Sequence, residues 1–547
     1  MTDRLKLSTE QTQDSHQREV GGGRLMLRAG MACHVSMRLC WLMPAMLAEG
    51  LTFLTACTVG PNYVKPATEV PGVYKEIKGW KVAQPKDHLT RGAWWEIFND
   101  PQLNALEEQV NISNQSLKVA EAQFRQARAL VQVARAAYFP TVTVGASFTR
   151  ARISPNAPSV AGATGTTGAS SPPYSDYLLG ADVSWEVDLW GRVRRTVEAS
   201  KATAQATAAD LESTRLLVQA ELGQDYFQLH TFDAQKQLLD ATVIDYQKFL
   251  ELTKNQYASG VASRADVLSA ETQLKTTQAQ AIDVGVQRAQ LEHAIALLVG
   301  KPASLFSIPV GPLMTGPPAV PVGVPSDLLE RRPDIAGSER RVAAANAQIG
   351  VAVAAYYPTV TLSASGGFET TNLSKWLIWP SRFWSVGPGI SETVFDGGLR
   401  RGQTAAARAA YDGTVASYRQ TVLTGFQEAE DNLAALRILE EEAKVQDEAV
   451  KAAQQSVDFT TNQYKAGTVS YLNVLVAQTI ALNNEITALG IASRRMTASV
   501  LLVKALGGGW AVSSLRSIDD PGIKGNKYQR PTETKSPPAD QPRVDAP

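Results

Sequence analysis

The chain has 547 residues, of which 44% are apolar and 19% are charged, and its 53 basic side chains balance 53 acidic ones. The apolar fraction is ample for a folded core, which excludes a chain that is disordered throughout. Zero formal net charge provides no long-range field for polyanions, which excludes the usual basic nucleic-acid interface. Beyond the N-terminal segment no window of about 18 apolar residues appears, so we expect no membrane-spanning helix in the remainder.

The N-terminal segment has the pattern of a secretory leader. Met37 begins a mostly apolar run that ends at Leu54-Thr55-Ala56-Cys57, and an apolar stretch before small residues is typical of a signal peptide. These last four residues resemble the lipobox of bacterial lipoproteins, in which the cysteine is acylated before cleavage. We predict that residues 1–56 are removed and that Cys57 carries the lipid. A buried structural cysteine is the alternative, since Glu49 interrupts the apolar run.

An internal duplication organises most of the chain. Asn255-Gln256-Tyr257, followed by Gly260, recurs as Asn462-Gln463-Tyr464, followed by Gly467. Two copies indicate a duplicated unit and not a solenoid. Each copy predicts a helical stretch, a strand, a loop, a second strand, a very long helix, a glycine turn and a return helix.

Four segments alternate apolar and polar residues as strands do. They are 141–149, 179–189, 359–365 and 384–393. Each has about ten residues, the length at which a tilted strand crosses a hydrocarbon layer. In the second segment the odd positions are apolar, and the even positions include Asp182, Ser184, Glu186 and Asp188. We predict that these four polar residues face a pore.

Two interpretations of these strands compete. They could cover a soluble core, or they could stand between lipid and water. In lipid their edges could not stay open, because unpaired backbone groups cost several kcal/mol each. Four strands are too few to close a barrel, since membrane barrels begin at about eight strands. The membrane interpretation therefore predicts an oligomer.

The helical segments are long and carry heptad seams. Residues 192–257 contain no proline, and such a helix would reach roughly 100 Å. Leu475, Leu482, Ile486 and Leu489 follow coiled-coil spacing on the second return helix. The first return helix has one seam with Ile282 and Val286, and another with Leu291, Ile295 and Leu298. Two seams predict neighbours on two sides.

The motifs, taken together, resemble the TolC-like outer membrane factors, and more narrowly their lipoprotein (NodT-type) branch, which works with resistance-nodulation-division pumps. They are Cys57 to Tyr63, Trp94-Trp95, Asp100-Pro101, Asp327 to Ile335 and both Tyr-x-x-Gly turns. The resemblance implies an α+β membrane protein: a homotrimer with a 12-stranded outer-membrane β-barrel, continued by a 12-helix periplasmic α-barrel. It also implies passive export of drugs or other small molecules, with a periplasmic adaptor and an inner-membrane pump as partners.

The same resemblance implies roles at the periplasmic tips. Gly260 and Gly467 would form the tip turns where the adaptor docks. Tyr257, Asp266, Tyr464 and Leu472 would form the tip latch and aperture. The sequence departs from the family pattern at Val469, where a basic residue is expected, unless Arg264 or Lys465 substitutes. It departs again at Asn473 and Val476, which are uncharged where acidic rings occur.

No enzyme or metal motif is found. Few histidines remain after the leader, no Cys/His cluster has metal-ligand spacing, and Gly507-Gly508-Gly509 lacks the features of a phosphate loop. We therefore expect no cofactor apart from the lipid on Cys57. A coiled-coil spacer lipoprotein, and a channel for type I protein secretion or metal-ion efflux, are the alternatives.

We divide the chain as follows: leader, 1–56; lipidated extended segment, 57–100; first repeat, 101–300; linker, 301–332; second repeat, 333–510; and disordered polar tail, 511–547.

Overall fold

The computed structural model describes residues 58–76, 93–152, 172–313, 316–320 and 325–510. Contacts divide the chain after Cys57, and all the described residues belong to the second unit. The leader, Cys57 itself and the polar tail lie outside the described residues.

The predicted succession of elements is present in both copies. The first copy contains the short 3-10 helix η2 (Trp94–Phe98), α2 (Pro101–Ser113), α3 (Gln115–Ala136), β1 (Thr141–Ala151), β2 (Tyr174–Val187), α4 (Arg192–Ala258) and α5 (Arg264–Val299). The second contains α7 (Pro333–Ala354), β3 (Thr359–Thr370), β4 (Arg382–Ser391), α8 (Leu399–Lys465) and α9 (Tyr471–Ala505). The linker holds η3 (Ala303–Leu305), η4 (Pro325–Asp327) and α6 (Leu328–Arg331), and η5 (Leu373–Lys375) and η6 (Trp379–Ser381) lie between β3 and β4.

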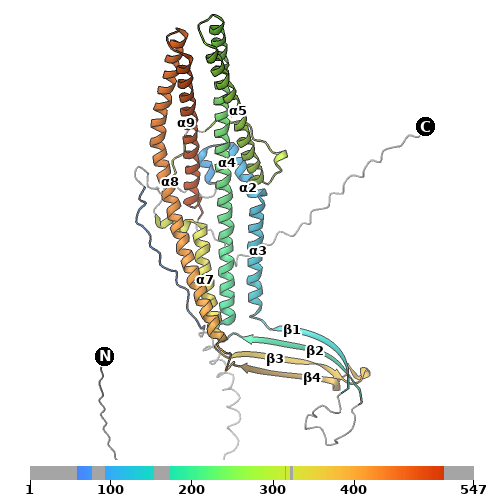
Figure 1. Ribbon diagram of the computed structural model, residues 1–547. Coiled ribbons are helices and arrows are strands. Elements are labelled where there is room, and N and C mark those ends of the chain that lie inside the picture. The colour runs from blue at the N-terminus through green and yellow to red at the C-terminus, as the bar shows by residue number, and fades with distance from the viewer. Residues whose placement is uncertain (1–57, 77–92, 153–171, 314–315, 321–324, 511–547) are drawn as a thin grey trace, which may run out of the picture. The chain divides into compact units, whose positions relative to one another are not determined.

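Two helices of 67 residues, α4 and α8, form the frame of the helical part (Figure 1). On the side of the strands, α3 packs on α4, and α7 packs on both α4 and α8. On the opposite side, α5 packs along α4 and α9 packs along α8 and α4. The two helical hairpins therefore lie next to each other and end in the two glycine turns.

The largest apolar cluster lies midway along the long helices. Trp94 and Phe98 of η2 are almost fully buried, and Phe98 packs on Phe227 of α4 with ring centroids 4.9 Å apart. The hydroxyl of Tyr226 donates to Asp100 Oδ2 at 2.7 Å. Burial of such aromatic side chains is a main source of stability. This explains the Trp-Trp and Asp-Pro motifs as structural.

The motif from Asp327 to Ile335 fixes the linker to the helices. Arg332 is 5% exposed, and its guanidinium donates to Glu428 of α8 at 2.7 Å and to the carbonyl oxygen of Ala505 at 3.1 Å. It also pairs with Asp334 at 2.7 Å. A buried guanidinium needs such partners, because an unpaired buried charge is strongly destabilising. The motif thus connects the start of α7 to α8 and to the end of α9.

One described helix differs from the expectation about membrane spans. The helix Tyr471–Ala505 is long and apolar enough to cross a membrane, with a mean hydropathy of 1.3 in its best window. The sequence-based statement that no such window exists was wrong. Its seam residues Leu482, Met496 and Val500 are buried against the neighbouring helices, as coiled-coil packing requires. The high hydropathy therefore has an explanation in helix packing.

The two seams of α5 have different surroundings in this chain. Ile295 and Leu298 of one seam are buried, whereas Ile282 and Val286 of the other are 74% and 54% exposed. An apolar seam at coiled-coil spacing is stabilised by a facing helix. The exposed seam therefore lacks its neighbour within a single described chain.

An isolated carboxyl group lies in the middle cluster. Glu107 on α2 is 0% exposed, and within the described residues neither carboxylate oxygen has a hydrogen-bond partner. Burial raises the pKa of Glu107 well above its ordinary value of 4.5. The folded state therefore binds this proton up to a higher pH than the unfolded state does.

We predict that Glu107→Gln removes part of the pH dependence of stability. With a raised folded pKa, the free energy of unfolding of the natural protein falls as the pH rises above about 4.5. The variant has no proton to lose at this position, so its melting temperature should fall less. Thermal melts in detergent between pH 4.5 and 8 measure this difference. Glu108→Gln is the matched control, because Glu108 is exposed, and an equal slope in all three proteins would contradict the prediction.

Candidate functional site

The four strands form one antiparallel sheet of order β1-β2-β3-β4, and β1 and β4 are its edges. The registers combine the alternating residues of all strands into two faces. One row of paired residues is apolar, Val142, Val183, Ala364 and Val386, and the next row is polar, Thr143, Asp182, Ser365 and Ser385. A shift of one residue in any pair would mix the two sets. The sheet is thus two-faced over its whole width.

The apolar face of the sheet has no cover in the described chain. Val144, Val386 and Ile390 are each more than 70% exposed. An exposed apolar surface of this extent marks an interaction site or a membrane surface. The strand lengths, 11, 14, 12 and 10 residues, fit a tilted crossing of the hydrocarbon layer. This geometry favours lipid on the apolar side.

The predicted pore residues fall into two groups. Asp182 and Ser184 lie in β2 on the polar face, where Ser184 is paired with Thr141 and Ser363. Asp188 lies beyond the end of β2 at Val187, so the predicted strand 179–189 is too long at this end. Glu186 lies in β2, and its carboxylate is paired with Arg192 of α4.

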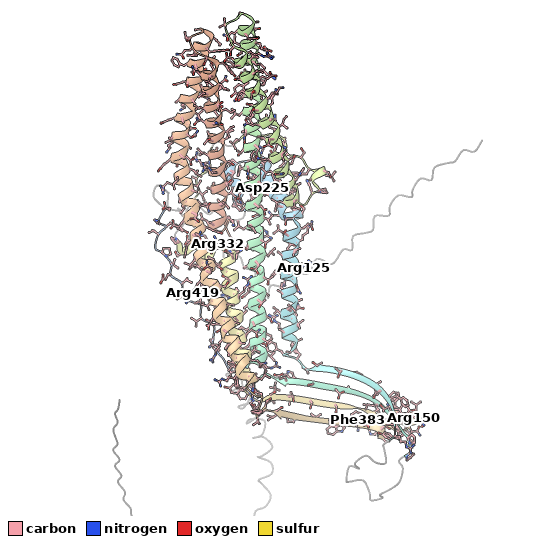
Figure 2. The ribbon with its side chains drawn as sticks, viewed as in Figure 1. Arg125, Arg150, Asp225, Arg332, Phe383 and Arg419 are labelled. Carbon is pink, nitrogen blue, oxygen red and sulfur yellow. The ribbon has the colours of Figure 1, made fainter. Side chains whose placement is uncertain are left out.

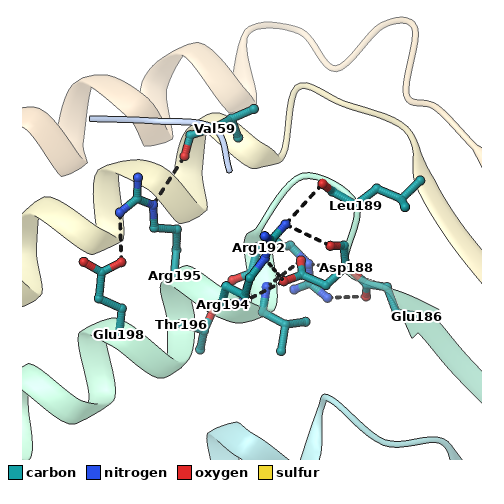
Figure 3. Close-up of polar contacts among 10 residues, drawn as sticks. Val59, Glu186, Asp188, Leu189, Arg192, Arg194, Arg195, Thr196 and Glu198 are labelled. Carbon is teal, nitrogen blue, oxygen red and sulfur yellow. Dashed lines mark hydrogen bonds and ion pairs between the residues drawn. The ribbon is translucent and has the colours of Figure 1, made fainter. Parts of the chain in front are cut away.

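Asp188 caps the helix that follows the strand. Its carboxylate accepts hydrogen bonds from the backbone N–H groups of Val193 at 3.0 Å and Arg194 at 2.9 Å (Figure 3). The Arg194 Nε also donates to it at 3.2 Å. A carboxylate at this position satisfies free N–H groups and favours the positive end of the helix dipole. Helix capping explains this acidic residue without reference to a pore.

The second copy repeats the cap. Asp396 accepts from the backbone N–H groups of Gly398 at 2.9 Å and Arg400 at 3.2 Å, and the Arg400 Nε donates to it at 2.6 Å. The Arg400 guanidinium lowers the pKa of Asp396 below its ordinary value. The duplication therefore preserves the turn from strand to long helix in both copies.

Aromatic side chains gather at both ends of the sheet. At the helical end, Trp190 stacks on Tyr357 with centroids 4.8 Å apart, and its Nε1 donates to the carbonyl oxygen of Pro358 at 2.7 Å. At the far end, Phe148 packs on Tyr177 with centroids also 4.8 Å apart. Aromatic girdles flank the apolar band of membrane barrels at the lipid headgroups. The two groups thus mark the two borders of a membrane band.

An extended strap, residues 58–76, follows Cys57 along the helices. The N–H of Val59 donates to the Trp190 carbonyl oxygen at 3.1 Å. Further along, the N–H of Lys75 donates to Glu430 of α8 at 2.7 Å. The strap therefore begins at the junction of β2 and α4. Cys57 itself is outside the described residues.

Glycine permits the close approach of the strap to α7. Gly60 has a φ of 92°, and a Cβ on it would lie 2.5 Å from the Cα of Gly350. Both the backbone conformation and the space therefore require glycine at position 60.

We predict that Gly60→Ala releases the strap. A non-glycine residue at this φ costs about 1–3 kcal/mol, and the clash with Gly350 adds to it. Limited proteolysis should cut residues 58–76 faster in the variant than in the natural protein. Gly72→Ala is the control in the same strap, since it has open space and no left-handed φ. Equal cleavage of both variants would contradict the argument.

The two hairpins end in nearly identical turns. Gly260 and Gly467 have φ values of 77° and 72°. Each donates its N–H to the carbonyl oxygen of a tyrosine three residues earlier, Tyr257 or Tyr464, at 3.0 Å. The left-handed conformation explains why both turns contain glycine.

A second apolar cluster joins the two hairpins near these turns. Tyr464 of α8 packs on Tyr471 of α9 with centroids 5.8 Å apart, and its hydroxyl lies 3.2 Å from the Thr253 Oγ1 of α4. Tyr246 and Leu250 of α4 belong to the same cluster. Neither Tyr471 nor Thr253 was predicted from the sequence as a tip residue. Tyr471 lies seven residues after Tyr464, across the turn, and its position could have suggested the contact.

The other predicted tip residues have different surroundings. Tyr257 and Leu472 are 48% and 61% exposed, so this chain does not bring them into contact with the buried cluster. Asp266 forms a capping box with Ser263 at the start of α5. Within the described residues neither Arg264 nor Lys465 forms an ion pair. The structure thus gives Asp266 a local capping role, and the aperture roles of Tyr257, Asp266 and Leu472 stay predictions.

A groove of about 430 Å³ lies between the hairpins just behind the tips. Phe249 and Leu252 of α4 and Val457 of α8 supply apolar walls. Its polar lining comes from both hairpins and includes the charged residues Asp245, Lys248, Asp458, Lys465 and Glu485. Both signs of charge line the groove, so it suits a polar segment of protein better than a simple anion or cation.

A metal centre was not expected, and the described residues contain no group of three or more His, Cys, Asp or Glu side chains that could hold a metal ion. His230 lies 3.2 Å from Asp233, which also accepts from Arg288 at 2.6 Å. This network joins α4 to α5 and to the linker at Ile308. It has a structural explanation in the packing of the linker.

Comparisons with known proteins agree with this geometry. The family model described as outer membrane efflux protein matches residues 106–301 and 324–508. The toluene efflux pump outer membrane protein TtgC of Pseudomonas putida is 30% identical over 467 residues, which cover 85% of this chain and 95% of that protein. The solvent efflux pump outer membrane protein SrpC of Pseudomonas putida is 31% identical over 466 residues, 85% of this chain and 97% of that protein. The solved outer-membrane channel OprN has a TM-score of 0.77 and 32% identity, over 83% of this chain and 100% of that chain.

The chain therefore belongs to the outer membrane efflux protein family. This confirms the fold class: an α+β membrane protein of the trimeric type, with an outer-membrane β-barrel continued by a helical barrel. It also confirms the location in the outer membrane, with the helices extending into the periplasm. The domain boundaries and the tip residues stay predictions.

We predict that Tyr464→Phe loosens the contact between the hairpins. The variant loses one buried hydrogen bond to Thr253, worth about 1 kcal/mol, so local opening should be about fivefold more frequent. Hydrogen exchange of the amides in the last turns of α8 and α9 measures this opening. Tyr257→Phe is the control, because Tyr257 is exposed at the equivalent position of the first hairpin. Unchanged exchange in Tyr464→Phe would show that the hydroxyl contributes nothing to the contact.

Proposed function

We propose that this chain is the outer-membrane exit channel of a tripartite efflux system. Small molecules would pass through it passively, from a periplasmic adaptor and an inner-membrane resistance-nodulation-division pump to the exterior. The single observation that carries the proposal is the four-stranded sheet with an uncovered apolar face, a polar face and two unpaired edges. Such a sheet can satisfy its backbone in lipid only by joining other copies.

Barrel closure needs β4 of one copy to pair with β1 of the next. Three copies would supply twelve strands, and the long hairpins would supply twelve helices. The exposed seam of α5 with Ile282 and Val286 supports this assembly, because it offers an apolar stripe to a neighbouring helix. The polar face, with Asp182 and Ser184, would then line a water-filled channel.

The tip cluster around Tyr464 and Tyr471 supports a gate. The contacts that join the hairpins within the chain are apolar packing and a hydroxyl pair, and the described tips contain no ion pair between hairpins. The tips would exist in an equilibrium between closed and open states. A partner that binds the groove behind the tips more tightly in the open state would shift this equilibrium toward opening. We propose that the adaptor docks at the turns of Gly260 and Gly467 and along this groove.

The start of the strap supports the lipid anchor. Thr58 follows Cys57 and contacts Gly191, so that a Cβ on this glycine would lie 2.6 Å from the Thr58 Cγ2. Gly191 lies at the junction of β2 and α4, beside the aromatic group that marks the membrane border. Acyl chains on Cys57 would therefore start close to the bilayer. Several tens of buried methylenes at about 0.8 kcal/mol each make such an anchor effectively permanent.

Transport through the channel would depend on the residues that line it and would not need a reactive centre. We propose no catalytic reaction and no cofactor other than the covalent lipid. The relatives named for toluene and solvent efflux support small molecules as cargo. Protein secretion and metal-ion efflux stay alternatives that a cargo assay can separate. A coiled-coil spacer is disfavoured, because it gives the apolar face of the sheet no cover.

Conductance tests the proposal directly. The purified protein should have the mass of a trimer and should insert into planar bilayers with few openings. Tyr464→Ala combined with Tyr471→Ala removes the tip cluster at a cost of about 3–5 kcal/mol per aromatic side chain. The double variant should open at least tenfold more often than the natural protein.

Val133→Ala is the control, because it removes an exposed apolar side chain of α3 away from the tips, and it should leave the openings unchanged. A monomeric protein in detergent, or a trimer that never conducts even with loosened tips, would support the spacer and overturn the channel.

A further inference from the structure

Two arginines lie on the lipid-facing side of the sheet, at the end that is far from the helices. Arg150 follows Val142, Val144, Ala146 and Phe148 on the apolar face of β1. Arg382 of β4 is paired with Phe368 of β3, and Phe368 is paired with Leu179 of β2. Arg382 therefore lies on the apolar face of the sheet. Figure 2 shows Arg150 and Phe383, the neighbour of Arg382, at this end of the sheet. Both apolar stripes of the edge strands thus end in a cation.

Carboxylates at the same end lie on the other face. Asp176 is paired with Thr149, and Glu369 is paired with Leu178; by the alternation of the strands both carboxylates lie on the same face as Asp182 and Ser365. The charges are therefore sorted by face: cations toward lipid and carboxylates toward the channel. Within the part of the chain that the structure describes, neither Arg150 nor Arg382 forms an ion pair. Water around this end of the sheet would give no reason to separate the two charges. A layer of negative charge outside the barrel would, because it attracts arginines to the outer face and repels carboxylates from it.

The environment of Arg382 fits the border of a membrane. The Trp379 ring lies under its guanidinium, with 3.5 Å from Cζ to the ring centroid. Trp379 is 72% exposed, and Trp384, the next residue on the same face, is 73% exposed. Amphipathic rings and long cationic side chains together occupy the level of lipid headgroups. The stacked ring also limits the freedom of the guanidinium, which leaves its N–H groups directed to a ligand at lower entropic cost.

We propose that Arg150 and Arg382 bind the phosphate groups of an anionic glycolipid in the outer leaflet. This rests on the proposed function, because the helices must lie in the periplasm for this end to face outward. Arginine suits phosphate because its planar guanidinium donates two parallel hydrogen bonds. Since β1 and β4 are the two edges, barrel closure brings the Arg150 strand of one copy next to the Arg382 strand of another. The lipid would therefore bind at the junctions between subunits.

Binding of a phosphorylated lipid tests this site. The probes are lipid A with both phosphates and the same lipid after enzymatic removal of the phosphates. The trimer of the full-length protein, freed of non-covalently bound lipid, should bind lipid A with phosphates more tightly than lipid A without them. Native mass spectrometry in detergent measures this binding. Arg150→Gln with Arg382→Gln should weaken that binding at least tenfold. Arg150→Lys with Arg382→Lys should restore part of it.

Arg125→Gln is the control, since Arg125 is an exposed arginine on α3 away from the strands (Figure 2), and it should bind the lipid like the natural protein. Equal binding of both lipid forms, or equal binding by the double glutamine variant, overturns the inference. Competition by millimolar inorganic phosphate alone would indicate a simple anion site and would overturn the lipid assignment. The trimer mass and the conductance are measured on the same samples. A conducting trimer without phosphate discrimination rejects this inference only, whereas a monomer rejects the proposed function.

Discussion

Backbone hydrogen bonding in lipid is the constraint on which the structure depends. Four strands with one apolar face form a sheet whose two edges carry unpaired N–H and C=O groups. Water could satisfy these groups, but hydrocarbon cannot, at a cost of several kcal/mol for each group. A single chain therefore cannot be the complete membrane unit, and the family fold resolves the problem by assembly. The location of the strands, the two faces of the sheet and the open seam of α5 all agree with this constraint.

The junction between strand and helix connects the membrane sheet to the periplasmic helices. Asp188 and Asp396 cap α4 and α8 at the point where the chain leaves the sheet. Both helices then continue for 67 residues, far beyond the thickness of a bilayer at 1.5 Å per residue. The strap from Thr58 fastens to the same junction, and the middle cluster around Trp94 and Phe227 fixes the hairpins halfway. The apolar cluster at the middle is therefore much larger than the cluster at the tips.

At the tips, local interactions determine the turns, whereas tertiary interactions determine how the two hairpins contact each other. The glycine turns follow from local geometry, because Gly260 and Gly467 adopt the left-handed conformation that other residues avoid. The contact of Tyr464 with Thr253 joins residues 211 positions apart, and no local pattern contains it. Asp266 looked like an aperture residue by resemblance, yet its carboxylate is used by the cap of α5. Of the set that the resemblance suggested, Tyr464 joins the hairpins within the chain, together with Tyr471 and Thr253, which it did not suggest.

Periodicity by itself determined most of the architecture of this protein. The alternation of period two, the heptad steps and the absence of proline from 192–257 fixed the strands, the seams and the long helix, because these depend on residues a few positions apart. Tertiary structure alone decided the register that aligns Thr143, Asp182 and Ser365, and the burial of Glu107. It also decided that Arg150 and Arg382 share the apolar face with each other and not with Asp176 and Glu369. These features depend on contacts between segments distant in the chain, and their free energies arise only when several elements pack together.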